Sequence, residues 1–289
     1  MAFNDWFSPI VMGILLGGLY ALIASGLSLV FGVMKLINVA HGDLVILGSY
    51  ISWVFFTRLG VDPIISLVVG IPVMFFVGFA IQKYLMARAF RFSTNTALII
   101  AFGISIILEN GFQMIFTPLT RALNTSYSMF SFTLFGAPIP LYYLLDFLVA
   151  GAGMIFLTQL LKRTYLGKSI TAASQDRKAA QLMGINNERT YAMAFGIATA
   201  FAAAAGVFLG LTFPFTPVSG TQFLIIAFGV IVLGGLGSVS GTFVGGMIFG
   251  LAQSLGGHIL GTSGQLLFAY LIVLVVLAVR PQGLFGRSR

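Results

Sequence analysis

The sequence has no cysteine, only two histidines and few charged residues. Without cysteine the chain can have no disulfide, no thiolate metal site and no thiol nucleophile, although this absence does not identify a cellular compartment. Charged residues make up 8% of the chain, whereas a soluble domain has about a quarter. Together with 58% hydrophobic residues and a mean hydropathy of +1.04, the scarcity of charge indicates an integral membrane protein.

Other absences narrow the class further. The sequence contains no P-loop of the form GxxxxGK[ST], so we do not expect this chain to hydrolyse ATP itself. The first ten residues, MAFNDWFSPI, lack the basic region of a cleavable signal, so the first apolar run is expected to stay as a helix. The apolar runs are continuous rather than alternating, which argues against a membrane barrel.

Continuous apolar runs predict an all-α polytopic bundle of about eight to ten transmembrane helices. The length leaves no room for a separate soluble domain, so residues 1–289 are expected to form a single transmembrane domain. The predicted segments are 10–34, 43–58, 63–83, 95–117, 141–161, 190–213, 222–236, 241–257 and 265–280.

The net charge of +8 comes from basic residues in short polar intervals, which favours a topology signal over nucleic-acid binding. The longest interval, Lys162–Arg189, carries six basic residues against Asp176 and Glu188, and such an excess marks the cytoplasmic side. Threading the nine segments from there leaves only Arg58 and Arg121 outside, which predicts an external N-terminus and a cytoplasmic C-terminus. The thirteen residues placed inside are Lys35, Lys83, Arg88, Arg91, Lys162, Arg163, Lys168, Arg177, Lys178, Arg189, Arg280, Arg287 and Arg289.

Three segments, 43–58, 222–236 and 241–257, are short for a full crossing and are predicted to be half-helices. Small and polar residues interrupt the apolar pattern at Asn38–Asp43 (NVAHGD) and at Gly234–Gly241 (GGLGSVSG). Interruptions at corresponding places in two halves point to a transport pathway and to a weak internal repeat, with chance similarity between glycine-rich segments as the alternative. The candidate pathway residues at these interruptions are Asn38, His41, Asp43, Ser238 and Thr242.

Two polar residues lie within an apolar run. Glu109 is an intramembrane carboxylate, which is costly and indicates function, and Gln113 lies on the same helical face. Both are candidate pathway residues, although Glu109 near the outer helix end also has the alternative of reaching the surface. Asp146 is closer still to a helix end and is expected at the interface. For His41 a structural hydrogen bond is favoured over metal binding, because His258 is the only other histidine, and no metal site is expected.

Glycines spaced by four predict close helix packing, within one chain rather than at a subunit interface. The pairs are Gly13 and Gly17, Gly206 and Gly210, Gly241 and Gly245, and Gly246 and Gly250. Between the fourth and fifth segments, Pro118–Pro140 is predicted to be an external loop. It is either a connector on the membrane surface, aided by its aromatic residues, or a contact for an extracytoplasmic partner. Those aromatic residues are Tyr127, Phe130, Phe132 and Phe135.

Within the polar interval Lys162–Arg189, residues Gly167–Met183 are alanine-rich and free of proline, and predict a helix of about four turns. Gly184 is expected to end this helix, and Asn186 or Asn187 to cap the next. The apolar face is predicted to contain Ile170, Ala173, Ala180 and Met183.

Three stretches resemble the Liv-type inner-membrane permeases of high-affinity branched-chain amino acid ABC importers. They are GLYALIASGLSLVFGVMKLINVAHGDLVILGSY (Gly18–Tyr50), LGKSITAASQDRKAAQLMGINNERTYAMAFGIATAFAAAAGVFLG (Leu166–Gly210) and FGVIVLGGLGSVSGTFVGGMIFG (Phe228–Gly250). Together they cover much of the chain in the expected order.

The resemblance implies a permease subunit that works with a second permease, related or identical, two cytoplasmic ATPase subunits and a periplasmic binding protein in a bacterial inner membrane. ATP and Mg would bind the partner subunits, and no cofactor is expected on this chain. The segment AAQLMGIN (Ala179–Asn186) is similar to the family's coupling loop, within the cytoplasmic segment 162–189. The docking residues implied are Ala173, Arg177, Lys178, Ala179, Ala180, Gly184 and Ile185.

The leading hypothesis is therefore a non-enzymatic permease that moves branched-chain or related amino acids inward and has no catalytic residues. One alternative is a self-contained secondary transporter or channel for a small polar solute. A membrane-embedded enzyme is a second alternative, disfavoured by the scarcity of paired carboxylates, histidines and cysteines. Other amino acids, urea, amides and aromatic acids remain open as substrates.

Overall fold

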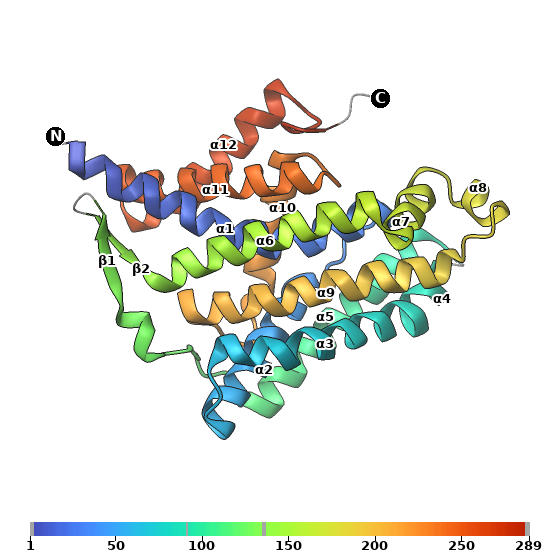
Figure 1. The fold of residues 1–289 in the computed structure, drawn as a ribbon, viewed down its shortest axis with the longest axis horizontal. Helices are drawn as coiled ribbons and strands as arrows, with labels where there is room; N and C mark the ends of the chain where they lie inside the picture. The colour runs from blue at the N-terminus through green and yellow to red at the C-terminus, as the bar shows by residue number, and fades with distance from the viewer. Residues whose placement is uncertain (1–2, 91, 135–136, 287–289) are drawn as a thin grey trace.

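The computed structural model describes residues 3–90, 92–134 and 137–286, which form a bundle of mostly long helices (Figure 1). Arg91, Arg287 and Arg289 of the predicted topology signal, and Phe135 of the predicted loop, lie outside the described residues. The long helices are α1 (Phe3–Met34), α2 (His41–Leu59), α3 (Pro63–Ala80, continued by a π-helix at Ile81–Met86 and by α4 at Ala87–Ala89), α5 (Thr94–Phe116), α6 (Leu141–Arg163), α9 (Asn187–Thr212), α10 (Ser219–Gly234), α11 (Val239–Leu260) and α12 (Gln265–Val279). The shorter elements are 3-10 turns at Ser126–Met129 and Thr262–Gly264, strands β1 (Ser131–Leu134) and β2 (Ala137–Pro140), and helices α7 (Tyr165–Gln175) and α8 (Arg177–Leu182).

The predicted all-α polytopic membrane fold is confirmed. Seven helices in the described part of the chain are long and apolar enough to cross a membrane. α10 is shorter, with 16 residues, and α2 is not among the seven. α11 is one of them with 22 residues, so the prediction of a half-helix at 241–257 is wrong.

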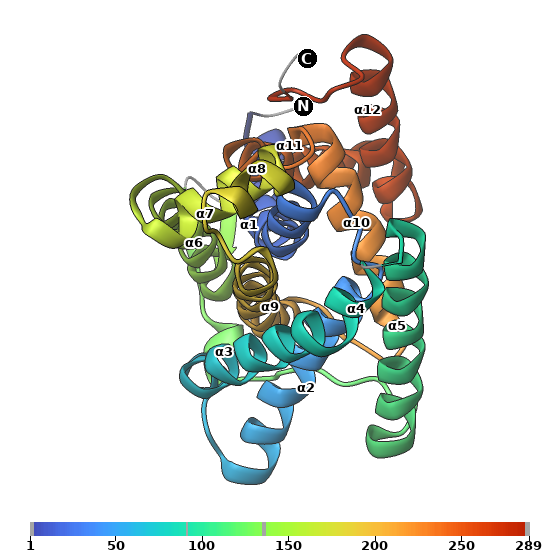
Figure 2. The same ribbon diagram turned by 90° about the vertical axis from the view of Figure 1, so that its right-hand side faces the viewer.

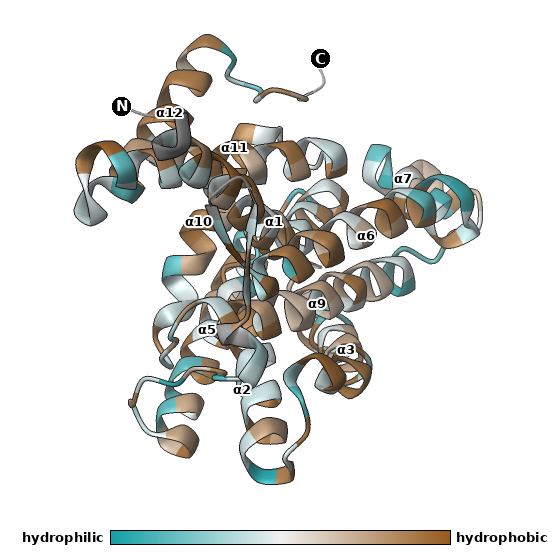
Figure 3. Ribbon diagram, turned by 60° about the vertical axis from the view of Figure 1, so that its left-hand side comes forward, coloured by the Kyte–Doolittle hydropathy of each residue, from teal (hydrophilic) through white to brown (hydrophobic). Residues whose placement is uncertain are grey.

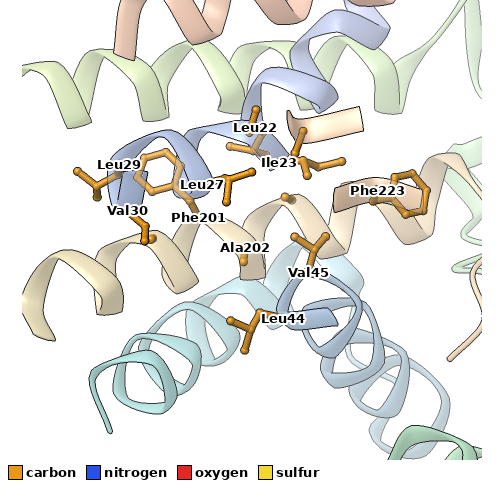
Figure 4. Close-up of a cluster of buried hydrophobic side chains, with 14 of the residues drawn as sticks. Leu22, Ile23, Leu27, Leu29, Val30, Leu44, Val45, Phe201, Ala202 and Phe223 are labelled. Atoms are coloured by element: carbon orange, nitrogen blue, oxygen red, sulfur yellow. The ribbon is translucent and has the colours of Figure 1, made fainter. Parts of the chain in front are cut away.

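Two helices form the centre of the bundle, α1 and α9 (Figure 2). α1 is apolar around its whole circumference and α9 is rich in alanine, so each can be surrounded by other helices. Their side chains meet those of α2 and α10 in the core (Figure 4). The core residues drawn there include Leu22, Ile23, Leu27, Leu29 and Val30 of α1, Leu44 and Val45 of α2, Phe201 and Ala202 of α9, and Phe223 of α10.

The glycines spaced by four pack helices of this chain together, as predicted. Gly13 and Gly17 of α1 lie against Gly250 and Gly246 of α11, and this pair of helices has the most extensive contact in the bundle. Removing both side chains lets the two backbones touch.

The bundle has two distinct ends. The end that carries α7 and α8, here the basic end, gathers hydrophilic residues (Figure 3), and the ends of α1, α4 and α6 also lie there. The segment after α12 approaches this end, where Phe285 lines a hollow together with Ile170 of α7. The other end, here the hairpin end, carries the antiparallel pair β1 and β2 and the C-terminus of α2 (Figure 1). No spanning helix lies in the described part of 118–140, so its prediction as a loop rather than a crossing is confirmed.

Two non-helical stretches, each partly buried, interrupt the bundle. Residues 35–40 connect the basic end of α1 to the start of α2, and residues 213–218 connect the hairpin end of α9 to the start of α10. The first is the interruption predicted at Asn38–Asp43. The sequence predicted the second interruption at Gly234–Gly241, which is wrong, because that segment is only the turn between α10 and α11. The second interruption is the stretch 213–218.

Candidate functional site

The N-terminal ends of α2 and α10 meet inside the bundle. A Cβ atom on Gly42 would overlap the carbonyl oxygen of Gly220, and a Cβ atom on Gly220 would overlap the Asp43 carboxylate. The His41 Nε2 atom lies 2.8 Å from the carbonyl oxygen of Ile23, which is about two-thirds of the way along α1. Two half-helices that start at mid-depth from opposite ends are typical of a transport pathway, and we name this meeting point the junction.

Asp43 is the charged residue of the junction. Its side chain is 2% exposed, and one carboxylate oxygen accepts a hydrogen bond from the Ser105 hydroxyl of α5. The other oxygen lies against Gly220 and has no hydrogen-bond partner among the described atoms. Asp43 occupies the first turn of α2 and faces the first turn of α10, so the positive ends of both helix dipoles favour its negative charge.

His41 and Asn38 support the non-helical backbone before the junction. The Asn38 side-chain oxygen accepts from the Ala40 amide at 3.2 Å, and the His41 amide donates to the Asn38 carbonyl at 3.1 Å. Both side chains are buried, as backbone without helical hydrogen bonds must be in a membrane. The structural role predicted for His41 is confirmed by its bond to Ile23.

Glu109 and Gln113 lie on α5, on the side that carries Ser105. Both are partly buried, and Glu109 is within electrostatic range of Asp43. Ser105 was missed in the sequence because a single serine in an apolar helix usually bonds its own backbone. Its position four residues before Glu109 was the available signal.

Ser238 and Thr242 lie away from the junction, at the basic end. The Ser238 hydroxyl caps α11 by accepting from the Gly241 amide at 3.1 Å, and the Thr242 hydroxyl donates to Ser28 Oγ at 2.8 Å. Ser238 lines a hollow of about 370 Å³ between α1, α7 and the α10–α11 turn. The structure thus groups Asn38, His41 and Asp43 together but not the two residues of the second interruption.

Asp146 differs from its prediction as an interfacial residue. It is 1% exposed, and neither carboxylate oxygen has a hydrogen-bond partner among the described atoms. The cause is the packing of α6 on α1, where Gly18 lies against the backbone of the next residue, Phe147. Within the described ranges, no three His, Cys, Asp or Glu side chains are grouped as metal ligands.

The polar segment at the basic end forms two helices rather than the single predicted one. Asp176 leaves helical geometry, and its carboxylate accepts from the amides of Lys178 at 2.8 Å and Ala179 at 3.0 Å. An aspartate that bonds the following amides ends one helix and starts another, so α7 stops at Gln175 and α8 begins at Arg177.

The predicted end signals of this segment are confirmed. Gly184 has φ +83°, and the Ile185 amide donates to the Ala180 carbonyl at 3.0 Å, which is a Schellman ending. The Asn186 side chain then caps α9 by accepting from the Arg189 amide at 3.0 Å. α8 is therefore joined to α9 by a short connection in which both the turn and the helix cap are hydrogen-bonded.

The predicted docking residues fall into two groups. Ala173 and Ala180 are buried against the bundle, as is Ile170, whereas Arg177, Lys178, Ala179 and Gly184 are exposed and Ile185 is partly buried. Met183 was predicted to share one apolar face with Ile170, Ala173 and Ala180, but it lies apart from these buried residues: it is 83% exposed, and its neighbour Leu182 is 88% exposed. Both lie beside the turn at Gly184, where the chain leaves the axis of α8.

Two hollows flank this turn. One, of about 430 Å³, lies between α7 and the start of α9, and the other, of about 350 Å³, lies beside α8. Gly184, Ile185 and Asn186 line both. The basic end therefore presents exposed apolar and basic side chains around two concave surfaces.

At the hairpin end, the loop after α5 is held against the bundle. The Tyr127 hydroxyl donates to Asp62 Oδ1 at 3.2 Å, and burial raises the pKa of Tyr127 to about 12. Arg121 forms an antiparallel bridge with Phe215 of the 213–218 stretch.

Comparison with known proteins gives one family match and several full-length relatives. Residues 10–279 match the family model described as "Branched-chain amino acid transport system / permease component". The chain is 31% identical to the high-affinity branched-chain amino acid transport system permease protein BraD of Pseudomonas aeruginosa, over 98% of this chain and 96% of the relative. It is 33% identical to the corresponding protein LivH of Salmonella typhimurium, over 95% and 94%.

One solved structure has a similar fold. PsaBC from Streptococcus pneumoniae, determined in complex with Fab, superimposes with a TM-score of 0.52 at 15% sequence identity, over 97% of this chain and 93% of that chain. At this identity the likeness concerns the fold of the chain.

Proposed function

The chain belongs to the family of permease components of branched-chain amino acid transport systems, and on this premise we propose that it is the transmembrane subunit of an ATP-driven importer of branched-chain or related amino acids. The family match over residues 10–279 carries the proposal. The relatives are named as high-affinity branched-chain amino acid permeases and align over nearly their whole length.

Energy is supplied by two cytoplasmic ATPase subunits, which hold ATP and Mg, since this chain has no P-loop. They dock on α8 and on the turn that follows it. Exposed Leu182 and Met183 supply apolar contact, Arg177 and Lys178 lie at the rim, and the two hollows beside Gly184 receive side chains of the partner. Buried Ala173 and Ala180 act indirectly, by holding α7 and α8 on the bundle.

Movement of α8 passes to the junction through α9. The Asn187 side chain donates to the Arg177 carbonyl at 2.8 Å, which fixes α8 to the start of α9. Near the far end of α9, the Gly206 carbonyl accepts a hydrogen bond from Ser49 of α2 at 2.7 Å. The solute path follows Asn38, His41, Asp43, Glu109 and Gln113, past the N-terminal ends of α2 and α10.

The basic end faces the cytoplasm of a bacterial cell, and the N-terminus lies outside the inner membrane. The distribution of the described basic residues supports this orientation, since ten of them lie at the basic end while Arg58 and Arg121 lie at the hairpin end. A second permease subunit, related or identical, completes the pathway, and lipid surrounds both. A periplasmic binding protein delivers the solute to the hairpin end.

Reconstitution into proteoliposomes tests this function. We expect leucine uptake only when the chain is combined with its permease partner, ATPase subunits, binding protein and ATP. Uptake by this chain alone, driven by an ion gradient, would contradict the proposal and favour a secondary transporter.

A matched pair of variants tests the docking surface. Leu182→Asp places a charge on the proposed apolar contact and should weaken binding of the ATPase subunits. We expect co-purification to fall at least about tenfold, which corresponds to a loss of about 1.4 kcal/mol in binding free energy. Leu59→Asp changes a leucine that is 65% exposed at the opposite end and should leave co-purification unchanged. Equal recovery of ATPase with both variants would remove the docking assignment.

A further inference from the structure

A cluster of aromatic side chains closes the space between α2 and α5 at the hairpin end. The Tyr50 ring stacks on Phe116 with 4.2 Å between centroids, and contacts Phe112 at 5.2 Å and Phe215 at 5.1 Å. Trp53 contacts Phe116 edge-on at 6.2 Å. We call these five residues the aromatic cluster.

Arg121 lies on this cluster with its charge uncompensated. Its guanidinium stands over the Trp53 ring at 4.6 Å, and Nη2 donates to the Phe116 carbonyl at 3.2 Å. The Nε atom is buried and has no hydrogen-bond partner among the described atoms. Arg121 as a whole is partly buried, and no carboxylate of a described residue forms an ion pair with it.

Tyr50 adds a second unused donor. Its side chain is fully buried, and its hydroxyl has no hydrogen-bond partner within the described part of the chain. The hydroxyl is within electrostatic range of Arg121. A guanidinium N–H can only donate and a tyrosine hydroxyl can donate, so the pair is complementary to an anion.

The backbone holds Arg121 in place. Its amide donates to the Phe215 carbonyl at 2.8 Å and its carbonyl accepts from the Phe215 amide at 2.8 Å, while the Leu123 amide donates to the Gly210 carbonyl at 2.9 Å. Phe215 belongs to the 213–218 stretch that leads to α10. On α2, Tyr50 lies seven residues after Asp43 in the direction of the hairpin end, so the aromatic cluster lies between that end and the junction.

We propose that Arg121 and Tyr50 bind the carboxylate of the amino acid, while the aromatic cluster contacts its branched side chain. A planar guanidinium suits the two oxygens of a carboxylate, and the surrounding rings suit an aliphatic group. The Arg121 Nε atom and the Tyr50 hydroxyl are covered in this structure, and the Phe116 ring stacks on Tyr50, so binding requires this ring, at the end of α5, to move aside. This proposal rests on the proposed function and names the residues that select carboxylate-bearing apolar solutes.

Trp53 provides a direct measurement, because Trp6 is the only other tryptophan. In a Trp6→Phe background, the assembled complex without binding protein is titrated with leucine, with 4-methylpentanoate, which lacks the amine, and with leucinamide, which lacks the carboxylate. We expect leucine and 4-methylpentanoate to change Trp53 emission, and leucinamide to leave it unchanged. An equal response to leucinamide, or no response to any of the three, would overturn the proposal.

Variants separate binding from folding. Arg121→Gln should raise the leucine concentration for half response at least about tenfold, and Tyr50→Phe, which removes only the hydroxyl, should raise it about threefold. Arg58→Gln changes the other described arginine at the hairpin end and should titrate like the parent. If the Arg121→Gln variant does not insert into the membrane, Tyr50→Phe and Arg121→Lys still test the assignment. Leucine titrations of both variants that match the parent would refute it. Normal ATP-driven leucine uptake with unaltered titrations would remove this proposal alone, whereas absent uptake by the parent complex would remove the proposed function.

Discussion

The junction can be broken with a single methyl group. Gly42→Ala places a Cβ atom on the carbonyl oxygen of Gly220, 2.7 Å from the Gly220 carbonyl carbon and 3.1 Å from the Leu224 Cβ atom. The nearest of these atoms belong to the backbone of the first turn of α10 and cannot rotate away. The two half-helices must therefore separate, which also moves Asp43 from its place against Gly220.

The expected cost follows from overpacking of a rigid interior, about 1–3 kcal/mol. For a chain of this size such a loss lowers the midpoint of thermal unfolding by roughly 2–12 °C. Gly103→Ala is the matched control, because Gly103 is also helical and a Cβ atom there meets no atom within 4 Å. Alanine is favoured over glycine in a helix interior by about 1 kcal/mol, so this variant should unfold at the same or a higher temperature.

Both variants are compared with the parent by tryptophan fluorescence during heating and by the fraction that remains monodisperse in detergent. Leucine uptake by the reconstituted complex is measured in parallel, and Gly42→Ala should lose it while Gly103→Ala keeps it. If the Gly42→Ala protein unfolds at the same temperature as the parent and transports leucine at the same rate, α2 and α10 do not meet as described.

Three further predictions concern the turn after α8, the junction and the orientation in the membrane. Gly184→Ala places a side chain at φ +83° at a cost of about 1–2 kcal/mol and should reduce uptake per ATP hydrolysed, whereas Gly184→Asn should be tolerated; equal coupling in both would show that the turn is not used. Ser105→Ala removes the hydrogen bond to Asp43 and should destabilise the protein by about 1–3 kcal/mol, with Ser105→Thr close to the parent in thermal unfolding; an unchanged Ser105→Ala would exclude this bond. Because the chain has no cysteine, Lys178→Cys should resist an impermeant maleimide in intact cells while Arg58→Cys reacts, and the opposite pattern would reverse the orientation.

The sequence predicted helices best where the signal is local. Runs of apolar residues located eight of the nine long segments to within about three residues, and the ninth, α1, begins seven residues before its predicted start. An unbroken apolar run of this length has no other stable form in a membrane. The stop at Gly184 and the cap at Asn186 were also predictable, since each depends on one side chain and its immediate backbone. Asp176 was not recognised, although an aspartate before alanines is a capping signal, because alanine content favoured a continuous helix.

The second non-helical stretch, residues 213–218, could not be found from composition. Residues 213–218 read FPFTPV and look like the continuation of an apolar run, whereas GGLGSVSG resembles an interruption but forms only a turn. Pro214 and Pro217 were the signal, since each lacks an amide donor and keeps the preceding residue extended. That Gly42 meets Gly220, 178 positions later in the sequence, is a property of the fold and leaves no local trace.

The same geometry explains how a small displacement at the basic end can reach the junction. Gly206 lies 19 residues after Asn187 on α9, a rise of about 28 Å at 1.5 Å per residue, so a tilt of about 5° at the basic end moves Gly206 by roughly 2.4 Å. Because Gly206 is in backbone contact with Val45 and Ser49, α2 has to follow. α2 carries Asp43 at its N-terminal end, and the interlocked glycines then require α10 to move or to separate from it. Either response changes the surroundings of Asp43, so a displacement of α8 can reach the junction through packed helices alone.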